Sequence, residues 1–145
     1  MKITIGRIDK ADFPELSLSD IDVKIDSGAY TSSIHCSDIK EIMVDGKKHL
    51  CFKLLDPKHL LYSNKEFIFK NYSNKKVKSS NGISEKRFLI ETSIIIFDQI
   101  FSIHLTLSER KEMKFPILLG RKFLSTKFVI DTAKQNLSHK LKSNK

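Results

Sequence analysis

The chain of 145 residues is 40% hydrophobic, which suits one folded globular domain and leaves little room for two. Its 26 lysines and arginines outnumber 17 acidic residues, and the formal net charge of +9 favours encounters with anionic partners. No apolar run reaches the roughly 20 residues of a membrane span, and the first residues lack a signal-peptide pattern. Two cysteines are too few for a disulfide framework, so we expect a cytoplasmic protein with reduced thiols and no membrane partner.

Apolar residues that alternate with polar ones predict β-strands in the first half of the chain. In chain order, the predicted strands cover residues 3–5, 21–25, 30–36, 41–44 and 49–54. Asp45-Gly46 separates the last two strands and predicts a tight hairpin turn. The polar stretch that follows, residues 56–76, is expected to be irregular, with one short strand at 67–69.

The second half continues this pattern. Asn81-Gly82 predicts a second hairpin, and Asp98-Gln99 predicts the turn after the long strand that follows it. The predicted strands are 77–80, 86–97, 100–107 and 128–131, with a short helix at 121–124. The expected fold is therefore all-β, a single closed barrel with hairpins formed by residues 1–133. Residues 134–145 are expected to be a basic, disordered tail.

A tight loop after the strand at 21–25 carries the candidate catalytic residues Asp26, Ser27 and Gly28. Two carboxyl groups about 3 Å apart share one proton. The ionised group then takes a proton from water while the protonated group polarises the scissile carbonyl. Gly28 would let two such loops approach each other, and the Ser27 hydroxyl would hold them in register. Because the chain has one good copy of this motif, a second Asp26 requires a symmetric dimer.

Two alternatives compete with this interpretation of the loop. Asp, Ser and Gly are common turn residues, so the motif could be an ordinary turn. Asp131 also follows an apolar strand and could pair with Asp26 within one chain, but no glycine follows it, and two catalytic lobes would be cramped in this length.

Two motifs in order resemble the retropepsin-like aspartic proteases: the Asp26 loop and, after a hairpin, Ile-Leu-Leu-Gly-Arg at residues 117–121. Most of the chain resembles one bacterial family of retropepsin-like proteins, known as ATP-dependent zinc proteases. They include RimB-like oligo-glutamate peptidases and are often encoded near RimK-type ATP-grasp ligases. The matching stretches are residues 5–7, Leu16, 24–29, 31–35, 79–82, Arg87, 105–107, 118–121 and 128–131.

This resemblance implies a homodimer of retropepsin-like barrels, each with a hairpin flap and one short C-terminal helix. It also implies an aspartic-type peptidase whose substrate is an extended acidic peptide. That peptide could be an oligo-glutamate tail that the partner ATP-grasp ligase adds to a ribosomal protein. The family's name does not establish a zinc or ATP requirement, and no cofactor is expected.

An acidic substrate needs cations around the catalytic pair, ideally guanidinium groups that bind carboxylates through two hydrogen bonds. The candidate cations are Lys24, Arg87 and Arg121, with Lys78 and Arg7 behind them, and Ala29 of the loop is a further candidate for binding the substrate. For each cation, the alternative is an exposed charge or a structural ion pair without a ligand. Tyr30 stands where the family usually has arginine, which weakens the assignment of an oligo-glutamate substrate.

The predicted turn at Ser80, Asn81 and Gly82 lies where retropepsins carry the flap over their substrate. In that role its backbone would pair with an extended peptide as an added strand. The alternative is a plain solvent-exposed hairpin, which Asn-Gly would also form.

Two other function classes remain open at this stage. A non-catalytic domain of this fold could bind an acidic peptide or RNA through its basic surface. A zinc-dependent peptidase could use four residues of suitable type, His35, Cys36, His49 and Cys51. Adjacent strand residues such as His35 and Cys36 point to opposite faces of a sheet, and the His-Glu-x-x-His motif is missing. We therefore assign no metal ligands.

Overall fold

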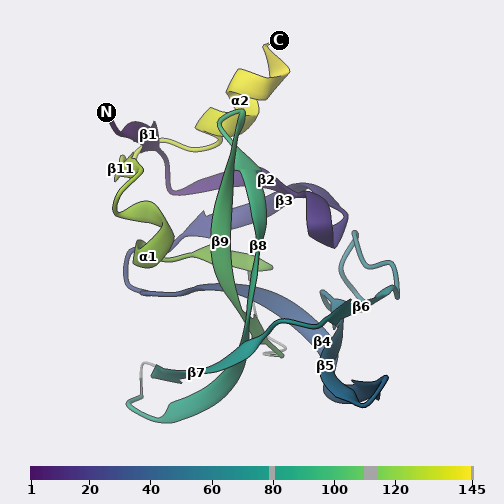
Figure 1. Ribbon diagram of the computed structural model, residues 1–145. Helices are drawn as coiled ribbons and strands as arrows, with labels where there is room; N and C mark the ends of the chain where they lie inside the picture. The colour runs from purple at the N-terminus through teal and green to yellow at the C-terminus, as the bar shows by residue number, and fades with distance from the viewer. Residues whose placement is uncertain (79–80, 110–113, 145) are drawn as a thin grey trace.

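The computed structural model describes residues 1–78, 81–109 and 114–144, and it is mostly β-sheet (Figure 1). The strands are β1 (Ile3–Ile5), β2 (Ile8–Phe13), β3 (Leu18–Ile25), β4 (Ser32–Val44), β5 (Lys47–Leu54), β6 (Glu66–Phe69), β7 (Ser73–Lys78), β8 (Ser84–Ile96), β9 (Gln99–Ser108), β10 (Ile117–Leu119) and β11 (Phe128–Ile130). The helices are the 3-10 turn η1 (Pro14–Leu16), α1 (Arg121–Leu124) and α2 (Leu137–Ser143). The helix predicted at 121–124 is confirmed as α1, and within the described residues no helix is both long and apolar enough to cross a membrane.

The main sheet closes on itself as a ring. Neighbouring strands follow the order β10-β3-β2-β8-β9-β4, and β4 then pairs back with β10. Strands β5 and β6 continue outward from β4, while β7 pairs with β8 as a hairpin. Strands β1 and β11 form a separate parallel pair. The expected all-β class is confirmed. Where a closed barrel was expected, the structure shows a sheet that closes into a ring.

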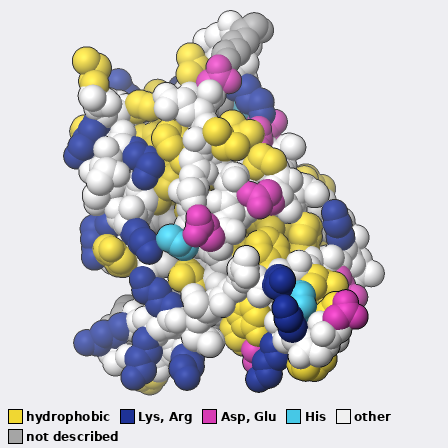
Figure 2. All heavy atoms as spheres, in the orientation of Figure 1, with side chains coloured by type: hydrophobic (Ala, Val, Ile, Leu, Met, Phe, Trp, Pro, Cys, Tyr) yellow, Lys and Arg dark blue, Asp and Glu magenta, His cyan; other side chains and the backbone are white. Residues whose placement is uncertain are grey.

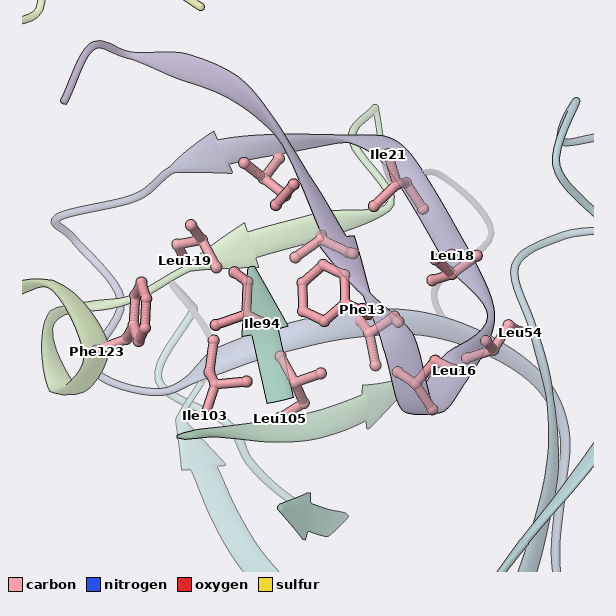
Figure 3. Close-up of a cluster of buried hydrophobic side chains, with 14 of the residues drawn as sticks. Phe13, Leu16, Leu18, Ile21, Leu54, Ile94, Ile103, Leu105, Leu119 and Phe123 are labelled. Atoms are coloured by element: carbon pink, nitrogen blue, oxygen red, sulfur yellow. The ribbon is translucent and has the colours of Figure 1, made fainter. Parts of the chain in front are cut away.

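Buried apolar side chains fill the inside of the ring (Figure 3). In β3, Leu18, Ile21, Val23 and Ile25 are buried and the residues between them are exposed, as a strand with one face on a core requires. Phe13 at the end of β2 is completely buried within the same cluster. The alternation of apolar and polar residues therefore decides which face of a strand in the ring is turned toward the core.

Several strands differ in extent from the prediction. Strand β4 runs unbroken through both predicted segments. Its pairing with β5 shifts register between Ser37 and Lys40, where Asp38 takes a left-handed conformation with φ 50°, and the strand continues past this point. Strand β2 was missed because its inward positions include a charged residue, Asp9, which hides the apolar alternation. Both predicted Gly turns connect hairpins, β4–β5 and β7–β8, although residues 79–80 lie outside the described part of the chain.

The structure corrects the expected disordered tail at 134–145, because Leu137–Ser143 forms α2. The buried Asp9 carboxylate accepts hydrogen bonds from the backbone N–H groups of Ser138, at 2.9 Å, and His139, at 3.1 Å. Lys142 pairs with Asp12 and Asp20, and its hydrogen bond lowers the pKa of Asp20. A helix of seven residues is unstable alone. Helix α2 is therefore held in place by acidic residues that are distant in sequence, namely Asp9 and Asp12 of β2 and Asp20 of β3.

The buried His35 on β4 predicts a pH effect on stability. Burial disfavours its charged form and lowers its pKa below the ordinary value of 6.5. The unfolded chain then binds this proton more tightly than the folded chain, so the free energy of unfolding falls as pH drops below about 6.5. Urea unfolding at pH 7.5 and 5.5 should show a larger loss for the wild type than for His35→Gln. Equal losses in the two proteins would contradict the prediction. Subtracting one loss from the other removes the contribution of the other histidines, which both proteins share.

Candidate active site

Asp26 lies directly after β3, at the point where this strand runs parallel to β10. Its backbone N–H donates a hydrogen bond to the carbonyl of Leu119 at 2.9 Å. The chain then turns back, because the N–H of Ala29 donates to the Asp26 carbonyl at 3.2 Å and the N–H of Gly28 donates to Asp26 Oδ1 at 3.1 Å. The Asp26 carboxylate is thereby held by its own loop.

The second motif clamps this loop from the other side. The N–H groups of Arg121 and Lys122 donate to the carbonyls of Ala29 and Tyr30, each at 2.8 Å. A Cβ atom on Gly120 would lie only 2.7 Å from the Tyr30 carbonyl oxygen, so the loop and α1 can approach this closely only at a glycine. Arg121 Nη1 also donates to the Ser27 carbonyl at 2.8 Å. The two motifs therefore form one unit.

A cleft with a volume of about 770 Å³ opens beside Asp26. On one side it is bounded by the Asp26 loop and α1, and on the other by β7 and β8. Its lining residues are Asp26, Gly28, Ala29, Tyr30, Thr31, Ser33, Lys75, Lys76, Val77, Lys78, Arg87, Thr106, Leu118 and Arg121. The half-buried carboxylate thus faces a space large enough for several residues of an extended peptide.

Positive charge dominates the walls of the cleft, where Asp26 is the single acidic lining residue among those described. Figure 2 shows lysine and arginine side chains gathered at the lower left, over the β7–β8 hairpin. Arg87 is compensated, because its Nε lies 2.8 Å from Glu85 Oε1. The Nζ of Lys75 and the guanidinium carbon of Arg121 lie 4.9 Å and 5.8 Å from the centre of the Tyr30 ring.

Not all predicted site residues reach the cleft. The predicted residues that line it are Asp26, Gly28, Ala29, Lys78, Arg87 and Arg121. The roles that were assigned to them remain predictions. Arg7 does not line it, and its guanidinium group donates to the Thr132 carbonyl and the Gln135 side chain instead.

The structure places the other predicted residues elsewhere. Lys24 is exposed on β3, between Ile8 and Leu118 of the adjacent strands, and does not line the cleft. Ser27 is exposed and contributes its carbonyl to the bond with Arg121.

The turn predicted as a flap lies at the tip of the β7–β8 hairpin. Gly82 has φ 84°, a left-handed conformation that suits glycine, and the side chain of Asn81 accepts the N–H of Ile83 at 3.3 Å. Ser80 lies outside the described residues. The strands of this hairpin, rather than Asn81 or Gly82, line the cleft.

Sequence reasoning missed Lys75 and Lys76 as cleft residues, because the stretch around them was interpreted as irregular. In β7, Lys75 and Val77 are half-buried whereas the residues on either side are exposed. Val77 is the one apolar residue at these half-buried positions, and the lysine two residues before it gives no apolar signal from which the strand could be predicted.

The residues of the zinc hypothesis do not gather with other suitable ligands. Across residues 1–78, 81–109 and 114–144, no group of three or more His, Cys, Asp or Glu is placed to hold a metal ion. Burial raises the pKa of the Cys36 thiol, and burial together with a hydrogen bond to Glu66 raises that of Cys51. The rival carboxylate, Asp131, accepts the N–H of Ala133 and does not line the cleft.

Comparison with known proteins finds relatives that are similar over most of this chain. The chain is 36% identical over 138 residues to a probable alpha-L-glutamate ligase of Desulfotalea psychrophila, covering 92% of this chain and 29% of that protein. For a probable alpha-L-glutamate ligase of Shewanella pealeana, the identity is 34% over 134 residues, covering 90% and 28%. The chain therefore spans less than a third of these relatives.

A solved structure shares the fold. The crystal structure of a Legionella pneumophila protein of unknown function, with the domain designation DUF785, superposes with a TM-score of 0.68. The two are 25% identical, over 95% of this chain and 99% of that one. Residues 4–140 match the profile of the RimB-like family, described as retropepsin-like aspartic endopeptidase RimB. The chain therefore belongs to the RimB-like family of retropepsin-like aspartic endopeptidases.

Proposed function

We propose that this protein is an aspartic peptidase that acts as a homodimer on an extended acidic peptide, such as an oligo-glutamate tail. One observation carries the proposal. The Asp26 carboxylate, fixed on a tight loop, lines a cleft whose other charged lining residues are all cations within the described part of the chain. A carboxylate in that position can activate water, and the surrounding cations favour a negatively charged substrate.

The chemistry needs a second carboxyl group, which we assign to the partner subunit's Asp26. The ionised member of the pair takes a proton from a water molecule, which then attacks the scissile carbonyl carbon. The protonated member donates a hydrogen bond to the carbonyl oxygen as it gains negative charge. The proton accepted by the first carboxylate later passes to the leaving nitrogen.

The relatives support the choice of substrate. Proteins named as probable alpha-L-glutamate ligases contain a region similar to almost all of this chain, within a sequence more than three times as long. A peptidase joined to such a ligase has the ligase product within reach. We infer a functional link between this chain and an ATP-grasp glutamate ligase, with both acting in the cytoplasm, and a glutamate-tailed protein, such as a ribosomal protein, as substrate.

The test uses the full chain and two synthetic peptides that end in four glutamates or four glutamines. We expect mass spectrometry to show cleavage of the glutamate peptide at least about tenfold faster, because charge-assisted contacts each contribute more than 1 kcal/mol. EDTA should not change the rate. The specific activity should rise with protein concentration as dimers form.

Three results would contradict the proposal. Binding of the glutamate peptide without cleavage would indicate a non-catalytic binding domain. Loss of cleavage in EDTA that zinc restores would indicate a metallopeptidase. A specific activity independent of concentration, together with a monomeric mass at all concentrations, would exclude the shared catalytic pair.

A further inference from the structure

We propose that Tyr30, Lys75 and Arg121 form a carboxylate-binding subsite beside Asp26, in which the Tyr30 ring positions two cations without neutralising them. The role of this subsite in substrate selection rests on the proposed function. Its ligand is a single carboxylate side chain of an extended acidic peptide. Tyr30 is a positioning residue, while Lys75 and Arg121 make the contacts to the ligand.

The three side chains come from both sides of the cleft. Tyr30 follows the catalytic loop, and its backbone carbonyl is fixed by the N–H of Lys122 at 2.8 Å. Tyr30 as a whole is 53% exposed and lines the cleft. Lys75 reaches the ring from β7, with Nζ 4.9 Å from the ring centre, and Arg121 reaches it from α1 at 5.8 Å. Both distances are within the roughly 6 Å at which an aromatic face attracts a cation.

Another cation that lines the cleft, Arg87, differs from these two. Arg87 is bound to Glu85, so its charge is largely compensated. Neither Lys75 nor Arg121 forms an ion pair within the described residues. An aromatic ring attracts a cation through its quadrupole and carries no net charge. Lys75 and Arg121 are therefore held in place and keep their full charge for a ligand.

The surrounding charges favour an anion at this point. Lys75 and Arg121 approach the same Tyr30 ring, and two like charges close to one another repel. An anionic ligand between β7 and α1 would reduce this repulsion. Arg121 uses Nη1 to bind the Ser27 carbonyl, which orients its guanidinium plane and leaves other N–H donors for a carboxylate.

Equilibrium binding tests the subsite separately from catalysis. The full chain carrying Asp26→Asn is titrated into fluorescein-labelled tetraglutamate or tetraglutamine, and fluorescence anisotropy gives the ratio of the two affinities. Tyr30→Phe, which keeps an aromatic face, should leave this ratio within about twofold. Tyr30→Leu should lower it by about threefold to tenfold, and Lys75→Met should lower it by about tenfold. The matched control, Lys86→Met, removes the same charge from an exposed position on the same hairpin and should change the ratio by less than about twofold.

Two results would overturn the subsite. In the first, Tyr30→Leu leaves the glutamate-to-glutamine ratio unchanged although the protein is folded by circular dichroism. In the second, Lys86→Met lowers the ratio as much as Lys75→Met, which would mean that overall charge and not this site selects the ligand. Because no turnover is measured, failure of the peptidase proposal would appear as absent cleavage by the wild type and would leave these affinities interpretable.

Discussion

Asp26→Asn is expected to lower kcat/KM for peptide cleavage by about 10²-fold to 10⁴-fold, which is the contribution of general acid–base catalysis by a positioned side chain. The fold should survive, since an asparagine side-chain oxygen can still accept the Gly28 N–H that Asp26 Oδ1 accepts at 3.1 Å. Cleavage is measured with the glutamate-tailed peptide, and folding with thermal unfolding monitored by circular dichroism.

Asp131→Asn is the matched control for this experiment. Asp131 also follows an apolar strand, and its side chain accepts the Ala133 N–H at 3.0 Å, a bond that asparagine can keep. This variant should retain wild-type activity, because Asp131 does not line the cleft. An equal loss in both variants would favour a catalytic pair within one chain.

A mixing experiment tests the sharing of the site between subunits. Wild-type protein titrated with excess Asp26→Asn protein would form mixed dimers with one carboxylate, and its activity should fall as these dimers form. The same excess of Asp131→Asn protein should not reduce the activity of the wild type. Unchanged activity in the first mixture, with subunit exchange demonstrated, would contradict a shared catalytic pair.

Gly120→Ala is expected to disturb the catalytic loop without removing any functional side chain. The new Cβ would lie 2.7 Å from the Tyr30 carbonyl oxygen and 2.9 Å from that of Ala29, and both are backbone atoms of the loop that carries Asp26. Such overpacking costs about 1–3 kcal/mol in the free energy of unfolding. A displacement of the loop by about 1 Å would lower kcat by about 10²-fold.

Gly46→Ala provides the comparison. Gly46 has φ 77° in the β4–β5 turn, and a Cβ there would meet no atom within 4 Å. This variant should lose stability through backbone strain alone and keep its activity. If Gly120→Ala lost stability but kept full activity, the close contact between α1 and the catalytic loop would not position Asp26.

The strands of the ring were predictable because burial on one face imposes a two-residue period on the sequence. That period is clear in β3, where apolar residues occupy the inward positions. It failed for β2, because the inward Asp9 is a charged residue whose partners, the N–H groups at the start of α2, lie about 130 residues away. For the same reason α2 was mistaken for a disordered tail.

The sequence by itself determined which chemical groups are available: an aspartate on a tight loop, a second motif that ends in Gly-Arg, and an excess of cations. These follow from local properties, namely the alternation of apolar residues and the conformational needs of turns. Only the tertiary structure decided that Gly120 contacts the Tyr30 backbone, that Lys75 and Arg121 meet at one ring, and that Lys24 lies outside the cleft. Contacts between segments distant in the chain depend on how the sheet closes, and no local pattern of residues records them.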